Sequence, residues 1–317
     1  MKQVILGSSG AIGTALAKEL AHYSKDITLV SRNPKKVNPT DNLLQADLTQ
    51  KENIERTIAK SEIVYVTIGF PYNTTIWKKN WIPLITNVIE SCIANQSKLV
   101  FFDNIYAVGA DHVHHITEES PFSPTSQKGM VRAEVDRIIL KNTESGKLKA
   151  VIARAPDFFG GTLKETSIIM NIVYNRLSKG KKAQWLCNAD KVHSYGYVRD
   201  LAKGTAMLGN TDDAFQQIWN LPTDKQKITG REWIQLFAKE LNCKPEFSIL
   251  PNWLLKTAGI FVSMMSEIAE MNYQYDRDYF FDSSKFDKYF GYTPTTNEIA
   301  VKQTVEENRR EEEADGE

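Results

Sequence analysis

The chain has 317 residues, of which 42% are hydrophobic and 25% are charged, as is typical of a soluble globular protein with one large and one smaller domain. Its 39 basic and 39 acidic residues balance, whereas nucleic-acid-binding proteins usually carry a basic excess, so no nucleic-acid partner is expected. Cys92, Cys187 and Cys243 lie far apart, outside any metal or redox spacing, which predicts reduced thiols.

The chain begins with a strand pattern and no signal peptide, so we expect a cytoplasmic protein. Short apolar runs then alternate with helical patterns. Strands are expected at residues 3–6, 27–30, 43–46, 63–68, 99–102 and 150–153, and helices at residues 14–21, 49–59, 81–94 and 125–141. We expect Thr49 and Glu52 to form a capping box. This alternation predicts an α/β fold, a Rossmann-type doubly wound parallel sheet with a smaller C-terminal α/β lobe.

The alternation of strand and helix patterns ends after residue 154, where turn signals become frequent. We expect residues 1–160 to form the nucleotide-binding domain, joined by residues 193–221, and residues 161–192 and 222–305 to form a substrate-binding lobe. The apolar run at residues 254–265 is too short to span a bilayer, which predicts a buried or amphipathic helix and no membrane contact. Residues 306–317 are almost wholly charged and are expected to form a disordered tail.

A glycine turn, Gly7-Ser8-Ser9-Gly10-Ala11-Ile12-Gly13, directly follows the first strand and opens the first helix. Glycines at these positions allow a tight turn and let the backbone approach a pyrophosphate at the helix N-terminus. In this context the pattern indicates a dinucleotide site rather than a plain turn.

The end of the second strand bears on the choice of dinucleotide, because a carboxylate there would bind the ribose 2′-hydroxyl of NAD. The strand ends Val30-Ser31-Arg32 without a carboxylate. Arg32 is suited to a forked contact with a 2′-phosphate, with Ser31, Asn33, Lys35 and Lys36 as helpers. We therefore predict NADP as the cofactor, with NAD left open.

Further segments resemble those of the extended short-chain dehydrogenase/reductases, the NAD-dependent epimerase/dehydratase group, of which this chain looks like an atypical member. They are Ala46-Asp47-Leu48, Val66-Thr67-Ile68-Gly69, Arg154-Ala155-Pro156-Asp157-Phe158-Phe159-Gly160, Tyr197-Val198-Arg199-Asp200-Leu201-Ala202 and Phe290-Gly291-Tyr292-Thr293-Pro294. The resemblance implies that Asp47 and Leu48 contact the adenine and that Gly69 lies beside the cofactor. Asp157 stands where the family usually has Asn.

The family uses a Tyr, a Lys four residues later that lowers the Tyr pKa, and a Ser or Thr on the fifth strand. Alignment on the fifth strand places Asn104 at the Ser/Thr position. Alignment of the next helix on Arg132-Ala133-Glu134 places Ser126 and Met130 at the Tyr and Lys positions. These two residues share a helical face, and Lys128 is rotated about 200° from it. We therefore expect the usual Tyr-Lys pair to be missing and Lys128 to face away from the site.

Tyr106 follows Asn104 by two residues, which in extended backbone places both side chains on one face at the end of the fifth strand. Tyr106 is the predicted substitute acid, with Asn104 beside it. A phenol needs a nearby cation or desolvation to act near neutral pH. The alternative is a packed tyrosine with a hydrogen-bonded hydroxyl.

Other candidates are weaker. His112, His114 and His115 lack further ligands nearby, so we expect a surface loop and no metal site. Asp157 and His193 are predicted substrate contacts, and a polar turn is the alternative for His193. Tyr72, Trp77 and Trp81 suit either the lining of a ligand cleft or core packing.

Two functions fit these patterns. The first is an enzyme that transfers hydride to or from a carbonyl or hydroxyl carbon of a small molecule held between the lobes. The second is a protein that binds the dinucleotide without turnover, as a redox sensor or partner-binding module. The apparent retention of a second lobe favours the enzyme, while the substrate and the oligomeric state stay open.

Overall fold

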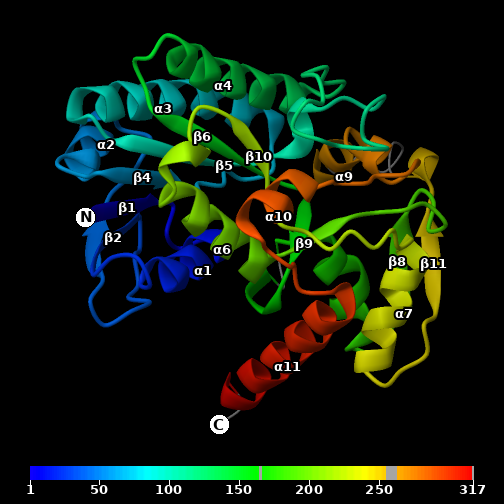
Figure 1. Ribbon diagram of the computed structural model, residues 1–317. Coiled ribbons are helices and arrows are strands. Elements are labelled where there is room, and N and C mark those ends of the chain that lie inside the picture. Colours follow the sequence, from blue (N-terminus) through cyan, green and yellow to red (C-terminus); the bar gives the residue numbers. More distant parts are fainter. Residues whose placement is uncertain (164–165, 255–262, 316–317) are drawn as a thin grey trace. The chain divides into compact units, whose positions relative to one another are not determined.

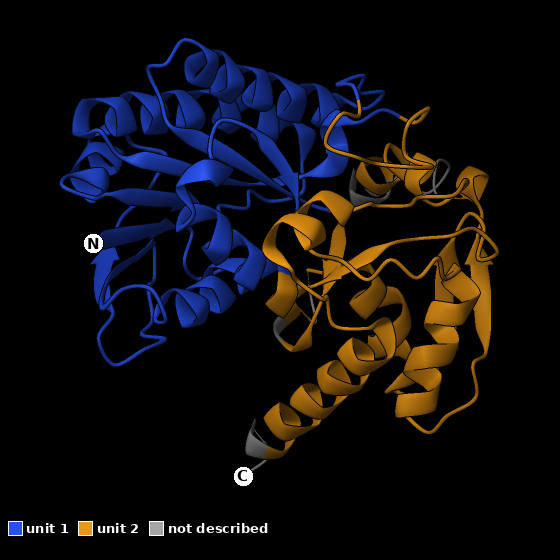
Figure 2. Cartoon of the chain, in the orientation of Figure 1, with its two compact units in different colours: residues 1–109, 121–155, 201–221 blue, residues 110–120, 156–200, 222–317 orange. Residues whose placement is uncertain are grey.

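The computed structural model describes residues 1–163, 166–254 and 263–315. These form two compact units (Figure 2). Unit 1 comprises Met1–Gly109, Pro121–Ala155 and Leu201–Leu221, and unit 2 comprises Ala110–Ser120, Pro156–Asp200 and Pro222–Glu317. Residues 110–120, 156–160 and 193–200, expected in the nucleotide-binding domain, lie in unit 2.

Unit 1 is built on a parallel sheet with the strand order β10-β6-β5-β4-β1-β2-β3 (Figure 1). The strands are β1 (Lys2–Leu6), β2 (Asp26–Ser31), β3 (Asn42–Gln45), β4 (Ile63–Val66), β5 (Lys98–Asn104), β6 (Ala150–Ala155) and β10 (Ile218–Asn220). β4 is buried along its whole length, as parallel strands covered on both faces must be. The predicted doubly wound α/β fold is confirmed.

Helices cover both faces of this sheet (Figure 1). α2 (Lys51–Ile58), α3 (Thr74–Asn95) and α4 (Gln127–Glu144) lie on one face, and α1 (Ala11–Leu20) and α6 (Val198–Gly209) lie on the other. α3 begins earlier than expected, because the Asn73 side chain accepts a hydrogen bond from the Ile76 N–H and so caps the first turn.

The strand order reverses direction between β1 and β4. From β1 the sheet continues to β2 and β3 on one side, and from β4 it continues to β5 and β6 on the other. In open α/β sheets, ligands bind outside the carboxyl ends of the strands at such a switch point. The glycine turn after β1 and the segment after β4 both lie there.

Unit 2 contains two short parallel strand pairs, β7 (Asp157–Phe159) with β9 (Tyr195–Tyr197) and β8 (Ala183–Leu186) with β11 (Phe247–Leu250). Its other main elements are α7 (Gly230–Glu240), α9 (Ser263–Ala269), α10 (Ser284–Phe290) and α11 (Asn297–Asp315). A capping box of Thr229 and Glu232 begins α7. Of the predicted helix at residues 254–265, residues 255–262 lie outside the described part of the chain. No described helix is long and apolar enough to cross a membrane.

The C-terminal segment differs from the expected disordered tail, because residues 306–315 continue helix α11. Val301, Val305 and Asn308 are buried, and the Arg309 guanidinium donates to the Glu240 carbonyl at the end of α7. Composition alone does not predict this helix, because only the helical spacing of its few buried residues among the charged ones indicates it.

We expect deletion of residues 306–317 to destabilise unit 2 by at least about 1 kcal/mol, because it removes buried Asn308 and its hydrogen bond to Thr304. Thermal unfolding monitored by circular dichroism measures the effect. A matched truncation after Glu313 should behave like the full chain, and equal melting temperatures for both truncations would contradict the packed role of α11.

Candidate functional site

The glycine turn is held against the end of β2. The N–H groups of Gly7 and Ser8 both donate to the Val30 carbonyl, at 2.9 and 3.1 Å. Gly7 has a φ of +96°, and a Cβ there would lie 2.8 Å from the Ile68 Cα. A Cβ on Gly13 would lie 2.6 Å from the Gly7 carbonyl oxygen. The protein's own packing therefore requires glycine at both positions.

Gly10 and Gly69 are different, because no protein atom crowds them. A Cβ on Gly10 would meet its nearest neighbour, the Gly7 oxygen, at 3.5 Å, and a Cβ on Gly69 would meet nothing within 4 Å. Both residues are exposed, and the buried hydroxyl of Ser8 has no hydrogen-bond partner among the described residues. A turn that stays bare toward the outside fits the close approach of a pyrophosphate.

The end of β2 carries hydroxyls and a guanidinium. The Ser9 and Ser31 hydroxyls lie 2.6 Å apart, and Ser9 also donates to the Asn33 carbonyl. Arg32 is exposed. A 2′-phosphate would find hydrogen-bond donors here, whereas the carboxylate that would receive a 2′-hydroxyl is missing from Ser31 and Arg32.

Asp47 lies near Arg32, after β3. Its carboxylate accepts hydrogen bonds from the Thr49 backbone and hydroxyl, at 3.0 and 2.8 Å. These bonds lower the pKa of Asp47, and the Arg32 charge adds a smaller effect. The expected capping box of Thr49 and Glu52 is wrong. Gln50 is the N-cap residue of α2 and makes no side-chain capping bond, and the Thr49 hydroxyl donates to Asp47 instead.

Asn104 and Tyr106 meet at the carboxyl end of β5. The Asn104 side chain accepts from the Tyr106 N–H at 3.0 Å and so caps the short helix η1 (Ile105–Ala107). The Tyr106 side chain is only 8% exposed. Its ring stacks on Trp77, and its hydroxyl lies 3.4 Å from the Tyr72 hydroxyl.

The orientation of α4 corrects the expectation for Lys128. Met130 is 50% exposed and Glu134 is also exposed, whereas Lys128 is fully buried. Ser126 caps the helix by accepting from the Gly129 N–H. The apolar residues Val131, Val135 and Ile139 are buried, and their spacing places Lys128 and Arg132 on the same inward face. This apolar pattern was the signal in the sequence that should have identified the buried face.

The Lys128 ammonium lies in a group of polar and aromatic side chains. Its Nζ atom is 4.6 Å from the centre of the Tyr72 ring and 3.4 Å from the Thr74 hydroxyl. Lys128, Tyr72, Thr74 and Tyr106 are called the Lys128 cluster below. All of them belong to unit 1, beside the carboxyl ends of β4 and β5.

A buried charge network lies under the same face of α4. Arg132 donates through Nε to Asp103 at 2.8 Å, and its guanidinium stacks 4.3 Å from the Trp81 ring. Asp136 and Arg154 are fully buried, and the guanidinium nitrogens of Arg154 have no hydrogen-bond partner within the described ranges. Burial raises the pKa of Asp136, as does the nearby Asp103 charge, against the opposing influence of Arg154.

Asp157 and His193 contact each other within unit 2. The His193 Nε2 lies 3.2 Å from an Asp157 carboxylate oxygen, and its Nδ1 lies 3.0 Å from the Gln274 carbonyl oxygen. The carbonyl only accepts, so Nδ1 is the donor in its contact with Gln274. The Asp157 side chain is 15% exposed and that of His193 only 2%.

Aromatic rings enclose this pair. The imidazole of His193 stacks on Tyr275 and Tyr279 at centroid distances of 4.3 and 4.5 Å, and the Tyr275 hydroxyl donates to Asp157. Burial, followed by the Asp157 charge, raises the pKa of Tyr275. His193 therefore has almost no surface for a ligand. It holds Asp157, whose carboxylate is partly exposed.

The neighbouring histidines His114 and His115 contact different partners. His114 bonds the Asp111 carbonyl, and His115 pairs with Asp282 and stacks on Phe280. Among the described residues, no group of three or more His, Cys, Asp or Glu side chains is arranged to hold a metal ion.

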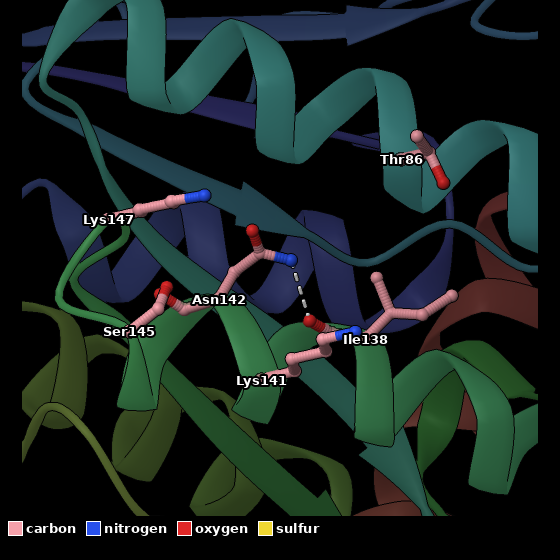
Figure 3. Close-up of a pocket in the computed structure, with 6 residues that line it drawn as sticks. All are labelled: Thr86, Ile138, Lys141, Asn142, Ser145 and Lys147. Atoms are coloured by element: carbon pink, nitrogen blue, oxygen red, sulfur yellow. Dashed lines mark hydrogen bonds between the residues drawn. The ribbon is translucent and has the colours of Figure 1, made fainter.

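A surface hollow of about 380 Å³ lies between the helices α3 and α4 (Figure 3). It is lined by Thr86, Ile138, Lys141, Asn142, Ser145 and Lys147. Apart from Thr86 of α3, these residues lie in the C-terminal half of α4 and in the loop before β6. This loop is at the amino ends of the parallel strands, whereas the glycine turn is at the carboxyl end of β1. None of the predicted site residues lines it.

Comparison with known proteins agrees with this geometry. The sequence pattern of the NAD dependent epimerase/dehydratase family matches residues 3–221. No curated protein matches the chain significantly.

Solved structures share the fold at low identity. The UDP-glucose 4-epimerase of Thermus thermophilus, solved with NAD, is 18% identical with a TM-score of 0.78, covering 98% of this chain and 99% of that one. A DesIV dTDP-glucose 4,6-dehydratase double mutant from Streptomyces venezuelae, with NAD and DAU bound, is 14% identical with a TM-score of 0.81, covering 99% and 98%. The dTDP-glucose 4,6-dehydratase of Bacillus anthracis str. Ames, in complex with NAD, is 17% identical with a TM-score of 0.78, covering 99% and 98%.

The parallel sheet, its switch point and the bare glycine turn define a Rossmann-type nucleotide-binding protein. With the match over residues 3–221, the chain belongs to the NAD dependent epimerase/dehydratase family, as its sequence motifs predicted.

We expect Gly10→Ala to keep the stability of the wild type and to weaken dinucleotide binding at least about tenfold, since its methyl group would enter the open approach to the turn. Gly13→Ala should instead destabilise the fold by about 1–3 kcal/mol through overpacking. Thermal unfolding and isothermal titration calorimetry with NADP⁺ and NAD⁺ separate the two effects. Wild-type dinucleotide affinity in Gly10→Ala would contradict this interpretation of the turn.

A second prediction concerns Asp136. A carboxyl whose pKa is raised by folding contributes its full stability below the pKa of the unfolded chain, near 3.9, and loses it as pH rises toward the folded value. Relative to wild type, Asp136→Asn should therefore gain about 1.4 kcal/mol for each pH unit across that interval. Urea unfolding between pH 4 and pH 7 measures the difference, and a constant difference would show that Asp136 ionises normally.

Proposed function

We propose that this protein is an NAD(P)-dependent oxidoreductase of the epimerase/dehydratase type, which transfers hydride to or from a carbonyl or hydroxyl carbon of a small polar molecule. The observation that carries the proposal is the bare turn at Gly10, placed at the switch point of the sheet and open to a ligand. Sugar nucleotides are the first substrate class to test, because the structural neighbours are named for them.

The proposed cofactor residues are those that the sequence motifs indicate. The turn from Gly7 to Gly13, with Ser8, Ser9, Ala11 and Ile12, would hold the pyrophosphate, and Gly69 would lie beside the cofactor. Asp47 and Leu48 would contact the adenine. Arg32, beside the hydroxyls of Ser9 and Ser31, supports NADP as the preferred cofactor, although the neighbours were solved with NAD.

The substrate residue in unit 2 is Asp157. Its carboxylate is partly exposed, and its contacts with His193 and Tyr275 fix its position. Such fixed acceptors orient the hydroxyl groups of a ligand without loss of side-chain entropy on binding.

Calorimetric titration with NADP⁺ and NAD⁺ tests the cofactor assignment. Arg32→Ala should weaken NADP⁺ binding about 10- to 100-fold, the value of a charge-assisted contact, and leave NAD⁺ binding unchanged. Lys25→Ala, which removes another exposed cation, should alter neither. Equal loss for both dinucleotides would exclude a 2′-phosphate contact at Arg32.

Turnover is then measured by NADPH and NADH absorbance with carbonyl compounds, and by chromatography of the products with UDP-glucose and dTDP-glucose, because an epimerase or dehydratase returns the hydride to its substrate and causes no net change in absorbance. Conversion of any of them supports the enzyme. Tight dinucleotide binding without turnover would instead favour the alternative, a redox sensor or partner-binding protein.

A further inference from the structure

The Lys128 cluster points to the acid–base group of the reaction, an inference that rests on the proposed function. We propose that the Tyr72 hydroxyl exchanges a proton with the substrate oxygen, while Lys128 stabilises the phenolate form of Tyr72 and Tyr106 is its hydrogen-bond partner. The sequence suggested Tyr106 and Asn104 for this role and left the required cation unidentified.

Exposure distinguishes the members of the cluster. Lys128 is fully buried and Tyr106 is 8% exposed, whereas Tyr72 is half-buried. Asn104 is used as the cap of η1, where it accepts from the Tyr106 N–H. A group that exchanges protons with a ligand needs surface, and within this cluster Tyr72 offers more of it than Lys128 or Tyr106.

The position of Tyr72 supports the same choice. It follows the carboxyl end of β4 and comes shortly after Gly69, whose open side fits a cofactor. β4 borders β1 in the sheet, so this segment lies beside the glycine turn at the switch point. Tyr72 is therefore close to the edge at which ligands of such sheets bind.

The charge around Tyr72 favours an anion. The Lys128 ammonium lies 4.6 Å from the centre of its ring, and burial strengthens this attraction because water does not screen it. Among the contacts described in unit 1, the ionisable groups that face Tyr72 are Lys128 from α4 and Tyr106 from η1. Lys78 of α3 is bonded to Gln127, and Arg132 is paired with Asp103.

Tyr106 completes the arrangement. Its hydroxyl lies 3.4 Å from that of Tyr72, and its ring is fixed by stacking on Trp77 at an interplanar angle of 18°. A fixed phenol at this distance is able to donate a hydrogen bond to the Tyr72 oxygen. This bond strengthens as the negative charge of the phenolate forms.

The step balances as follows. In the oxidation direction the C–H and O–H bonds of the alcohol break, a C=O bond forms, and the hydroxyl proton passes to the Tyr72 oxygen. An oxidised nicotinamide, when bound, would accept the hydride and with it the two electrons that the alcohol loses. Reduction runs in reverse, with Tyr72 as the acid.

Variants of the cluster test the proposal. Tyr72→Phe keeps the ring under Lys128 and should keep the dinucleotide affinity, while kcat falls about 10²- to 10⁴-fold, the usual contribution of a general acid or base. Lys128→Met should move the rising limb of the kcat–pH profile for alcohol oxidation to higher pH, because the phenolate loses its cation. Tyr289→Phe, a change at an exposed tyrosine, is the matched control and should leave both unchanged. Wild-type kcat in Tyr72→Phe, or an unmoved profile in Lys128→Met, would overturn the proposal.

A second readout does not require turnover. In protein labelled with ¹³C at tyrosine Cζ, the Tyr72 signal, assigned by its loss in Tyr72→Phe, should titrate at lower pH in wild type than in Lys128→Met. Circular dichroism confirms that each variant is folded. If the Tyr72 signal titrates alike in both proteins, the role of Lys128 is excluded. Failure of the proposed function is recognised separately, as the absence of NADP⁺ and NAD⁺ binding to the wild type.

Discussion

The buried ion pair between Arg132 of α4 and Asp103 of β5 is the contact on which the candidate site depends. Both side chains are almost fully buried, and Arg132 is further enclosed by the Trp81 and Phe101 rings. Loss of one partner would leave an uncompensated buried charge, which typically costs about 3–5 kcal/mol. The pair therefore fixes the rotation of α4, and with it the inward direction of Lys128 one turn earlier.

The same pair explains which parts of the site were predictable. The glycine turn is local, because strand, turn and helix follow one another within the first residues, and the sequence contains the whole signal. The face of α4 is set by a partner on another strand. Lys128 and Arg132 look like solvent-facing cations in the sequence, and only the apolar spacing of Val131, Val135 and Ile139 indicates that this side turns inward.

Unit 2 and the C-terminus show a related limit. His193 has the chemistry of a ligand contact, but Tyr275 and Tyr279, which enclose it, lie about eighty residues away along the chain and gave no sign of that role. In α11 the charged composition suggested disorder, whereas a few buried side chains at helical spacing suffice to dock the helix. In both cases long-range packing decided the outcome over local composition.

These observations separate what the fold provides from what the chemistry requires. Gly7 and Gly13 serve the packing of the turn itself, and Gly10 alone of the three leaves open space for a ligand. Members of a shared fold differ in the side chains that do the chemistry, and here the buried face of α4 presents Lys128 toward the ring of Tyr72. A cation that is too buried to meet a substrate still acts through a phenol that has surface. In the proposed mechanism, the loop after β4, which the sequence motifs mark only as lying beside the cofactor, is the place where hydride transfer and proton transfer meet.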